Sequence, residues 1–161
     1  MLLSFISVSA YAQTTYTDEN NLLTLTYPAE WTLLPDDGMA PGITNGEIDF
    51  RVNASLYTGL DTVHIPNIYN AEYRQMLQYS LSSVLNTMYE VTDYGTIVLD
   101  GVDAYYMLMT GTKGEREGKN LYFLQTQTPN SIVSLYIEGP KDEVTGKNEI
   151  IQDIISTVKF N

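Results

Sequence analysis

The sequence contains no cysteine in its 161 residues. This absence excludes disulfide bonds, zinc sites with thiolate ligands, iron–sulfur clusters, thiol catalysis and the lipid-modified cysteine of a bacterial lipoprotein. Histidine is almost as scarce, since His64 is the only one. A histidine that acts as a base needs a nucleophile beside it, and the chain has no G-x-S-x-G motif to supply one. We therefore expect His64 to be a solvent-facing loop residue, and we predict no catalytic residue.

Basic residues are also few. Eight Lys and Arg stand against 20 Asp and Glu, which gives a formal net charge of -12. Residues 13–100 carry twelve acidic residues but only Arg51 and Arg74 as basic ones. Such a charge repels nucleic acid and anionic lipid headgroups, so we expect neither as a partner. Two interpretations of the acidity stay open, a solubilising surface and an acidic docking patch, and the first is the simpler.

Motifs that hold phosphates or metals are missing as well. Neither G-x-x-x-x-G-K-[ST] nor G-x-G-x-x-G occurs, so nucleotide chemistry lacks its phosphate cradle. Oxygen ligands suited to Ca²⁺ flank one loop, but their spacing does not match the EF-hand pattern. The sequence therefore predicts no metal site and no cofactor. The loop residues in question are Asp36, Asp37, Asn45, Glu47 and Asp49.

The N-terminus has features of an export signal. An apolar run from Leu2 to Ser9 is followed by Ala10-Tyr11-Ala12 and then by polar residues, as in an h-region with an A-x-A cleavage site. We expect a signal peptide at 1–12 and one secreted or periplasmic domain at 13–161. No Lys or Arg precedes the apolar run, although a signal peptide usually begins with one; a true start upstream of Met1 would account for this. The alternative to a signal peptide is that the run forms the buried first strand of a cytosolic protein. No other segment approaches the roughly 20 apolar residues of a membrane span.

The first half of the chain predicts strands separated by turns. Leu22 to Tyr27 alternates apolar and polar residues, and Pro28 ends the strand because proline lacks a backbone donor. Trp31, the only tryptophan, opens a short strand to Leu34 and is expected to anchor the core. Residues 35–46 are rich in turn formers and predict a surface loop. Residues 47–57 predict a strand with one wet face; its inward residues are Ile48, Phe50, Val52, Ala54 and Leu56.

The second half predicts a long helix, a strand meander and a closing helix. The helix runs from Tyr69 to Met88, with Asn67 as its N-cap. Asp100-Gly101 predicts a type I′ hairpin between 96–99 and 102–110. Strands at 120–128 and 131–137 carry apolar residues on both faces and belong in the sheet centre. The charged turn 113–119 is expected to be a solvated hairpin tip. The closing helix carries Ile150, Ile151, Ile154, Ile155 and Val158 on one face and ends near Lys159.

These elements predict an α+β fold. We expect an α/β/α sandwich around a mostly antiparallel sheet of about seven strands, with one long central helix and a C-terminal helix.

The order of elements and five short stretches of the chain together carry a family resemblance. These stretches are Tyr27-Pro28, Trp31, Gly101, Tyr105-Tyr106 and Ile154 to Phe160. They resemble the PsbP-like superfamily, whose members include the photosystem II extrinsic protein, a nuclear Ran-GTPase partner of the Mog type, bacterial envelope proteins of unknown function and cytosolic chaperones for secreted toxins. The resemblance covers nearly all of 13–161 and implies an α/β/α sandwich with a binding or accessory role, usually without catalysis. The signal-like N-terminus departs from the toxin chaperones, and the missing cysteine departs from lipoproteins.

We therefore expect an exported, non-enzymatic protein that binds a protein partner in the cell envelope. Thirteen tyrosines are unusually many, and exposed tyrosines suit a protein or glycan contact surface, although Tyr57, Tyr79 and Tyr94 could equally cover the sheet and helix. The candidate partner surface comprises Asp36, Asp37, Glu47, Asp49, Tyr57 and Tyr79.

Two other functions stay open. One is a carrier of a small apolar ligand between the long helix and the sheet, although core methionines are commoner. The other is a hydrolase with paired carboxylates, for which no pair stands out in the sequence. The methionines that motivate the carrier are Met76, Met88, Met107 and Met109.

Overall fold

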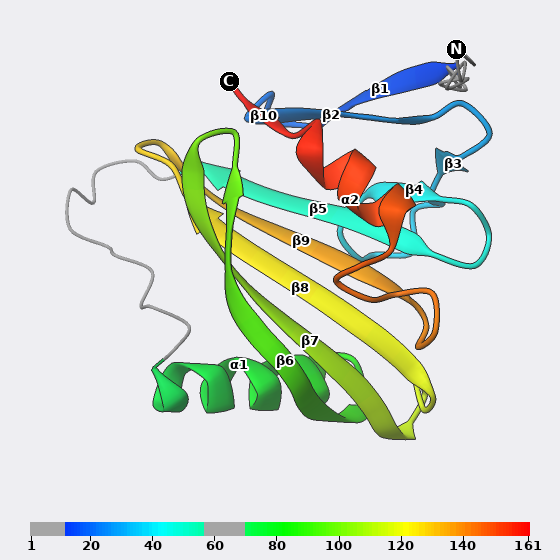
Figure 1. Ribbon diagram of the computed structural model, residues 1–161, viewed down its shortest axis with the longest axis vertical. Helices are drawn as coiled ribbons and strands as arrows, with labels where there is room; N and C mark the ends of the chain where they lie inside the picture. Colours follow the sequence, from blue (N-terminus) through cyan, green and yellow to red (C-terminus); the bar gives the residue numbers. More distant parts are fainter. Residues whose placement is uncertain (1–11, 57–69) are drawn as a thin grey trace, which may run out of the picture.

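The computed structural model describes residues 12–56 and 70–161 (Figure 1). All strand pairs in it are antiparallel. A seven-stranded sheet has the order β3-β4-β5-β9-β8-β7-β6, and a three-stranded sheet has the order β1-β2-β10. The elements are β1 (Gln13–Thr17), β2 (Leu23–Pro28), β3 (Thr32–Leu33), β4 (Gly42–Thr44), β5 (Asp49–Leu56), α1 (Ala71–Val84), β6 (Thr87–Leu99), β7 (Val102–Gly114), β8 (Lys119–Gln127), β9 (Ser131–Pro140), α2 (Glu149–Ser156) and β10 (Lys159–Phe160).

The α+β class and the antiparallel sheet are confirmed, and so is the local chemistry behind several elements. Asp100 and Gly101 both have positive φ angles, 46° and 80°, as a type I′ hairpin turn between β6 and β7 requires. Trp31 is 4% exposed within the larger hydrophobic cluster, so it is the core anchor that was expected.

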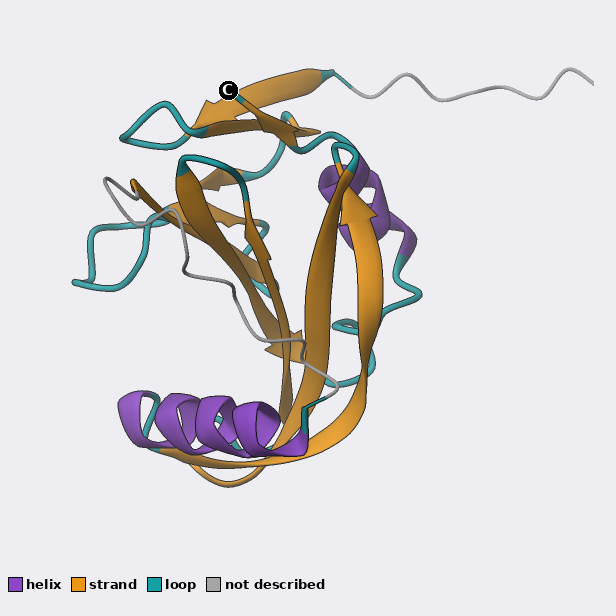
Figure 2. Cartoon of the chain, turned by 90° about the vertical axis from the view of Figure 1, so that its left-hand side faces the viewer, coloured by secondary structure: helices purple, strands orange, loops and turns teal. Residues whose placement is uncertain are grey.

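The central strands bury side chains on both faces of the large sheet. On β8, Tyr122 and Leu124 belong to one hydrophobic cluster and Leu121 and Phe123 to the other, and successive residues of a strand point to opposite faces. Helix α2 packs on the first of these faces, together with the three-stranded sheet. We call it the closed face. Helix α1 packs on the other, which we call the open face (Figure 2).

Helix α1 is shorter than predicted. It covers 14 residues, Ala71–Val84, and its N-cap is Asn70, whose side chain accepts hydrogen bonds from the amides of Glu72 and Tyr73. The predicted start at Tyr69 and cap at Asn67 lie outside the described residues. The predicted end at Met88 is wrong because Asn86 takes a left-handed conformation, φ 47°, that ends the helix before β6 begins.

The predicted sandwich is only partly formed, because one outer layer consists of α2 together with a second sheet. Strands β1, β4 and β10 in the two sheets were not predicted. The first is polar except for Tyr16, and its turn to β2 forms because the Asp18 carboxylate accepts the amides of Leu22 and Leu23 at 2.6 and 2.7 Å. Strand β4 lies in the predicted loop and depends on Gly42, where a Cβ would overlap the Phe50 carbonyl oxygen.

Leu56 and Ile150 are among the apolar residues that lie on the surface, contrary to the sequence pattern. Leu56 is 57% exposed because β5 ends there, at the rim of the sheet. Ile150 is 46% exposed in the first turn of α2, whereas Ile151, Ile154 and Ile155 are buried as predicted. Neither described helix has the length and apolar character needed to cross a bilayer.

Candidate binding cleft beside helix α1

The open face of the large sheet is covered by α1 over only part of its width. Phe50 and Val52 of β5 point into the closed face, so Asp49, Arg51 and Asn53 point to the open face. Cross-strand pairing places Asp49 beside Glu138, which in turn is beside Leu121. The open face is therefore polar over β5 and β9 and apolar where β8 and β7 pass beneath the helix.

Helix α1 forms a wall of this open region and is not sunk into the core. None of its residues is fully buried. Leu77 and Leu81 are half-buried against the sheet, and Val84 is 80% exposed. Two hydrogen bonds hold the helix in place: the Tyr73 hydroxyl donates to Gln125 Oε1 at 2.7 Å, and Gln78 Nε2 donates to the Tyr89 carbonyl at 2.6 Å.

Between α1, the open face and the loop around Met39 lies a cleft of about 660 Å³, which we call the α1 cleft. One side carries the ionic groups of the loop and of β5 and β9. The other side is apolar, and Met39 and Val84 are exposed at its rim. A cleft of this volume with an apolar floor and a few polar groups is typical of binding sites. The floor and the adjoining wall consist of Leu77, Leu81, Leu85, Leu121, Phe123 and Tyr136.

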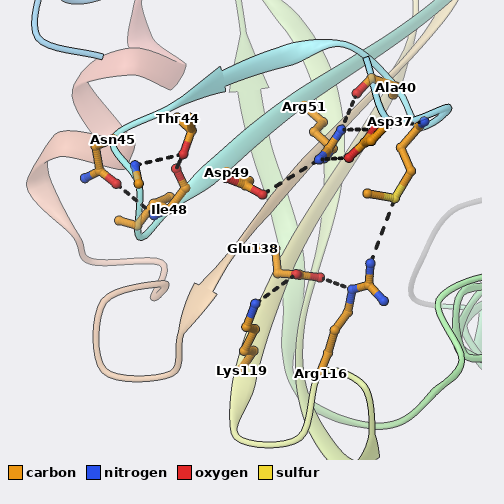
Figure 3. Close-up of polar contacts among 12 residues, drawn as sticks. Asp37, Ala40, Thr44, Asn45, Ile48, Asp49, Arg51, Arg116, Lys119 and Glu138 are labelled. Carbon is orange, nitrogen blue, oxygen red and sulfur yellow. Dashed lines mark hydrogen bonds and ion pairs between the residues drawn. The ribbon is translucent and has the colours of Figure 1, made fainter. Parts of the chain in front are cut away.

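Arg51 organises the ionic side of the cleft (Figure 3). Its guanidinium donates two hydrogen bonds to Asp37, at 2.8 and 3.2 Å, and one to the Ala40 carbonyl at 2.9 Å. The Asp49 carboxylate lies 3.7 Å from the same guanidinium. The hydrogen bonds from Arg51 and from the Met39 amide lower the pKa of Asp37. We call Asp37, Arg51 and Asp49 the Arg51 cluster; it holds the loop against β5.

A second set of ionic contacts centres on Arg116, at the tip of the β7–β8 hairpin. Its Nε donates to Glu138 at 2.7 Å, and an Nη donates to the carbonyl of Leu85, the C-cap of α1, at 2.8 Å. Lys119 lies 3.6 Å from the same Glu138 carboxylate (Figure 3). The other Nη lies 3.9 Å from the Met39 sulfur. Arg116 thus joins hairpin, helix, sheet and loop.

The hairpin tip was predicted to be fully solvated, and for Arg116 this is wrong. Its side chain is 15% exposed because it folds back beneath the end of α1. Glu115 lies 3.7 Å from it, so two carboxylates, Glu115 and Glu138, balance the charges of Arg116 and Lys119.

Two tyrosines beside the cleft are shielded from water. The Tyr89 hydroxyl is buried and has no described hydrogen-bond partner, and burial raises its pKa. Burial also raises the pKa of Tyr136, whose ring lies 5.2 Å from that of Phe123. Both phenols therefore remain neutral and protonated at physiological pH.

The structure places the predicted partner residues in different settings. Asp37 and Asp49 meet on Arg51, while Asp36 and Glu47 are exposed nearby, Asp36 accepting the Gly38 amide at 3.2 Å. Tyr79 is 78% exposed on α1 and lines a second, shallower hollow. Tyr57 and His64 lie outside the described residues.

The methionines expected to line a ligand cavity do not do so together. Met107 and Met109 are fully buried under α1, whereas Met76 and Met88 are 53% and 62% exposed. The cleft between helix and sheet is lined instead by leucines and aromatic residues.

Sequence reasoning missed Arg116, Glu138 and the wall formed by Val84. A signal for the β5 side was present, because the alternation of residues 47–57 predicted a strand with one wet face, in an antiparallel sheet or at a sheet edge. The structure places β5 inside the antiparallel sheet, and its wet face lines the cleft.

The carboxylates of the cleft differ in their contacts. Asp37 and Glu138 each accept hydrogen bonds from an arginine, whereas Asp49 lies 3.7 Å from Arg51 and beside Glu138 on the neighbouring strand. Within residues 12–56 and 70–161, no three carboxylate or imidazole side chains gather as they would around a metal ion.

The sequence matches no protein-family profile and no curated protein, but the structure resembles several solved ones. Cyanobacterial PsbP (CyanoP) from Synechocystis has a TM-score of 0.68 at 15% identity, covering 99% of both chains. The Ran-binding protein Mog1p of Saccharomyces cerevisiae has 0.59 at 12% identity, covering 94% of this chain and 96% of its own. LpqN, involved in cell envelope biogenesis of Mycobacterium tuberculosis, has 0.59 at 15% identity, covering 93% and 91%. The chain therefore has the fold shared by the PsbP-like and Mog1 proteins, as its sequence order suggested.

Proposed function

We propose that this protein is an exported, non-enzymatic binding protein that engages a protein partner in the cell envelope through the α1 cleft. The observation that carries the proposal is the half-covered open face, where an amphipathic helix with no buried residue borders a cleft of about 660 Å³. Exposed apolar groups such as Val84 and Met39 at a cleft rim are typical of contact surfaces.

Three further observations support parts of this proposal. The apolar run ending in Ala10-Tyr11-Ala12 supports export. Among proteins of the same fold, one is described as Ran-binding and another as involved in cell envelope biogenesis, which supports a binding role and an envelope location. The predicted acidic surface contributes Asp37 and Asp49 directly to the cleft, with Asp36 beside them.

Site-specific photocrosslinking in cells of the source organism tests the proposal. A photoreactive residue replaces Val84 at the cleft or, as the matched control, Asp153, an exposed residue of α2 on the closed face. We expect one protein to crosslink from position 84 and not from 153, and that protein, once purified, to bind the natural chain. Identical products from both positions, or none from position 84, would contradict the proposal. A third position, Tyr79, tests whether the contact extends over the outer side of α1.

A second candidate function, carriage of a small apolar ligand, is favoured by the leucines and Phe123 on the cleft floor. Native mass spectrometry of the protein purified from its source separates the two functions. A mass addition that disappears on denaturation identifies a carrier, whereas an unmodified mass together with a crosslinked partner identifies a partner-binding protein.

A further inference from the structure

The charges of the α1 cleft are not evenly balanced between its two ends. At one end, Arg116 and Lys119 face Glu138 within the cleft, and Glu115, outside the cleft lining, lies 3.7 Å from Arg116. At the other, the carboxylates of Asp37 and Asp49 share the single guanidinium of Arg51, which leaves one negative charge uncompensated.

Asp49 carries the uncompensated negative charge. Asp37 binds Arg51 through both of its oxygens, at 2.8 and 3.2 Å, and thus occupies the guanidinium. Asp49 lies at 3.7 Å, beyond hydrogen-bond distance, and its side chain is 37% exposed at the cleft. Its carboxylate therefore retains acceptor sites that a cationic group can reach from solvent.

The net charge of the chain, -12, favours a cationic ligand over an anionic one at long range. Within the cleft, Arg51 and Arg116 already donate to carboxylates, and Lys119 lies at the Arg116 end, 3.6 Å from Glu138. The surrounding field therefore attracts cations and repels anions before any contact forms.

An apolar surface lies a short distance from Asp49. Asp49 pairs across the sheet with Glu138, and Glu138 pairs with Leu121 on the next strand, so two strand spacings, about 10 Å, separate Asp49 from the apolar floor. Val84 and Met39, exposed at 80% and 41%, stand above that floor. Adjacent apolar and basic residues of one short peptide segment can span this distance.

We propose that the α1 cleft takes a segment of the partner protein that combines an apolar anchor with a basic side chain, the anchor lying against the exposed Val84 and Met39 and the cation reaching Asp49. This inference rests on the proposed function and adds the chemistry of the partner. Charge complementarity to the Arg51 cluster distinguishes it from a second copy of this chain, which would bring its own net negative charge to the same cleft.

Fluorescence anisotropy with three labelled synthetic peptides tests the inference. The first peptide alternates pairs of leucines with pairs of lysines. In the second peptide every lysine of the first is replaced by glutamate, and in the third every leucine is replaced by serine. We expect the leucine–lysine peptide to bind most tightly and the affinity to fall as salt concentration rises, because part of the attraction is electrostatic.

Matched protein variants separate cleft binding from general attraction to an acidic chain. Asp49→Asn and Asp153→Asn each remove one negative charge, the first in the cleft and the second on α2. Arg51 keeps Asp37 in the first variant, so the fold is preserved, which a thermal melt verifies. We expect Asp49→Asn to weaken binding about fivefold and Asp153→Asn less than twofold.

The inference is overturned if both variants weaken binding equally, if the glutamate peptide binds as well as the lysine peptide, or if the serine peptide loses no affinity. Self-crosslinking at position 84 in the purified protein would also overturn it in favour of a dimer. If position 84 captures a partner in cells but the leucine–lysine peptide is not preferred, the proposed function stands and this inference fails. If the leucine–lysine peptide is preferred but position 84 captures no protein in cells, the inferred chemistry of the cleft stands and the proposed function fails.

Discussion

The two faces of the seven-stranded sheet are built in different ways. On the closed face, 21 buried residues form one continuous cluster with α2, the small sheet and Trp31. On the open face, five buried residues of the described part of the chain gather beneath α1, and the helix itself has no fully buried residue. The two helices differ accordingly: α2 buries Ile151, Ile154 and Ile155 within eight residues, whereas the longer α1 has Val84 almost free in solvent.

This difference separates the roles of the two faces. Buried apolar area is the main source of folding free energy, so the closed face carries most of the stability. The open face combines a modest apolar cluster with ionic contacts at Arg51 and Arg116, which position the walls of the cleft. Regions with few buried contacts open at low free energy, as binding sites often do.

The largest expected effect comes from truncating a matched side chain on each helix. Ile151→Ala on α2 should lower the free energy of unfolding by about 2–5 kcal/mol, because it leaves a cavity in a fully buried site. Leu77→Ala on α1 should lower it by only about 1 kcal/mol, because that side chain is half exposed before the change. Urea denaturation measures both. Equal losses would mean that the two faces share the stability and that the comparison is wrong.

An intermediate effect is expected from Arg116→Ala, which removes hydrogen bonds to Glu138 and to the Leu85 carbonyl. The cost should be about 2 kcal/mol, since both are charge-assisted and the side chain is 15% exposed. Hydrogen exchange should show faster exchange in α1 and little change in α2, because the lost contact supports the end of α1. Lys113→Ala, an exposed residue of the same hairpin, is the control. Loss of protection throughout the sheet would show that Arg116 supports the fold rather than the helix.

The smallest effect concerns acid stability on the open face. Arg51 lowers the pKa of Asp37 in the folded state, so the pair stabilises the fold above the ordinary pKa of aspartate, about 4, and this contribution is lost as pH falls through the folded value. Asp37→Asn should therefore lower the melting temperature slightly at pH 7, with the difference disappearing as pH falls through the lowered folded pKa of Asp37. Asp36→Asn, whose carboxylate accepts the Gly38 amide, is the control. A difference between natural protein and Asp37→Asn that persists in acid would exclude this linkage.

Most helices and strands could be predicted because neighbouring residues in the sequence determine them. Alternation placed Leu23, Leu25 and Tyr27 in the core, and Asp100-Gly101 identified a hairpin turn. Strands β1, β4 and β10 escaped prediction because they are short and are stabilised by pairing with β2 or β5 rather than by an apolar pattern of their own. The overlong helix followed from reading Met88 as part of the apolar stripe, whereas Asn86 ends the helix.

The candidate site was predictable only in part. Asp37 and Asp49 were identified from the acidic first half, but not their shared contact with Arg51, whose partners come from 14 and 2 residues away and meet only when the loop folds onto β5. Arg116 was predicted to be solvent-exposed because a run of charged residues usually lies on the surface. Its contacts with Leu85 and Glu138 lie 31 and 22 residues away in the chain.

The sequence by itself determined the class of fold, the acidic surface, the buried strands and the absence of thiol chemistry, because composition and short-range periodicity control those properties. Only the tertiary structure decided that α1 packs over part of one sheet face, beside a cleft in which the polar side chains of the inner strand β5 meet apolar ones. The alternation of polar and apolar residues along a strand indicates which of its faces is exposed to water. Whether that face meets open solvent or the wall of a cleft depends on where the helix packs. Here the position of the helix is set by contacts between residues far apart in the chain.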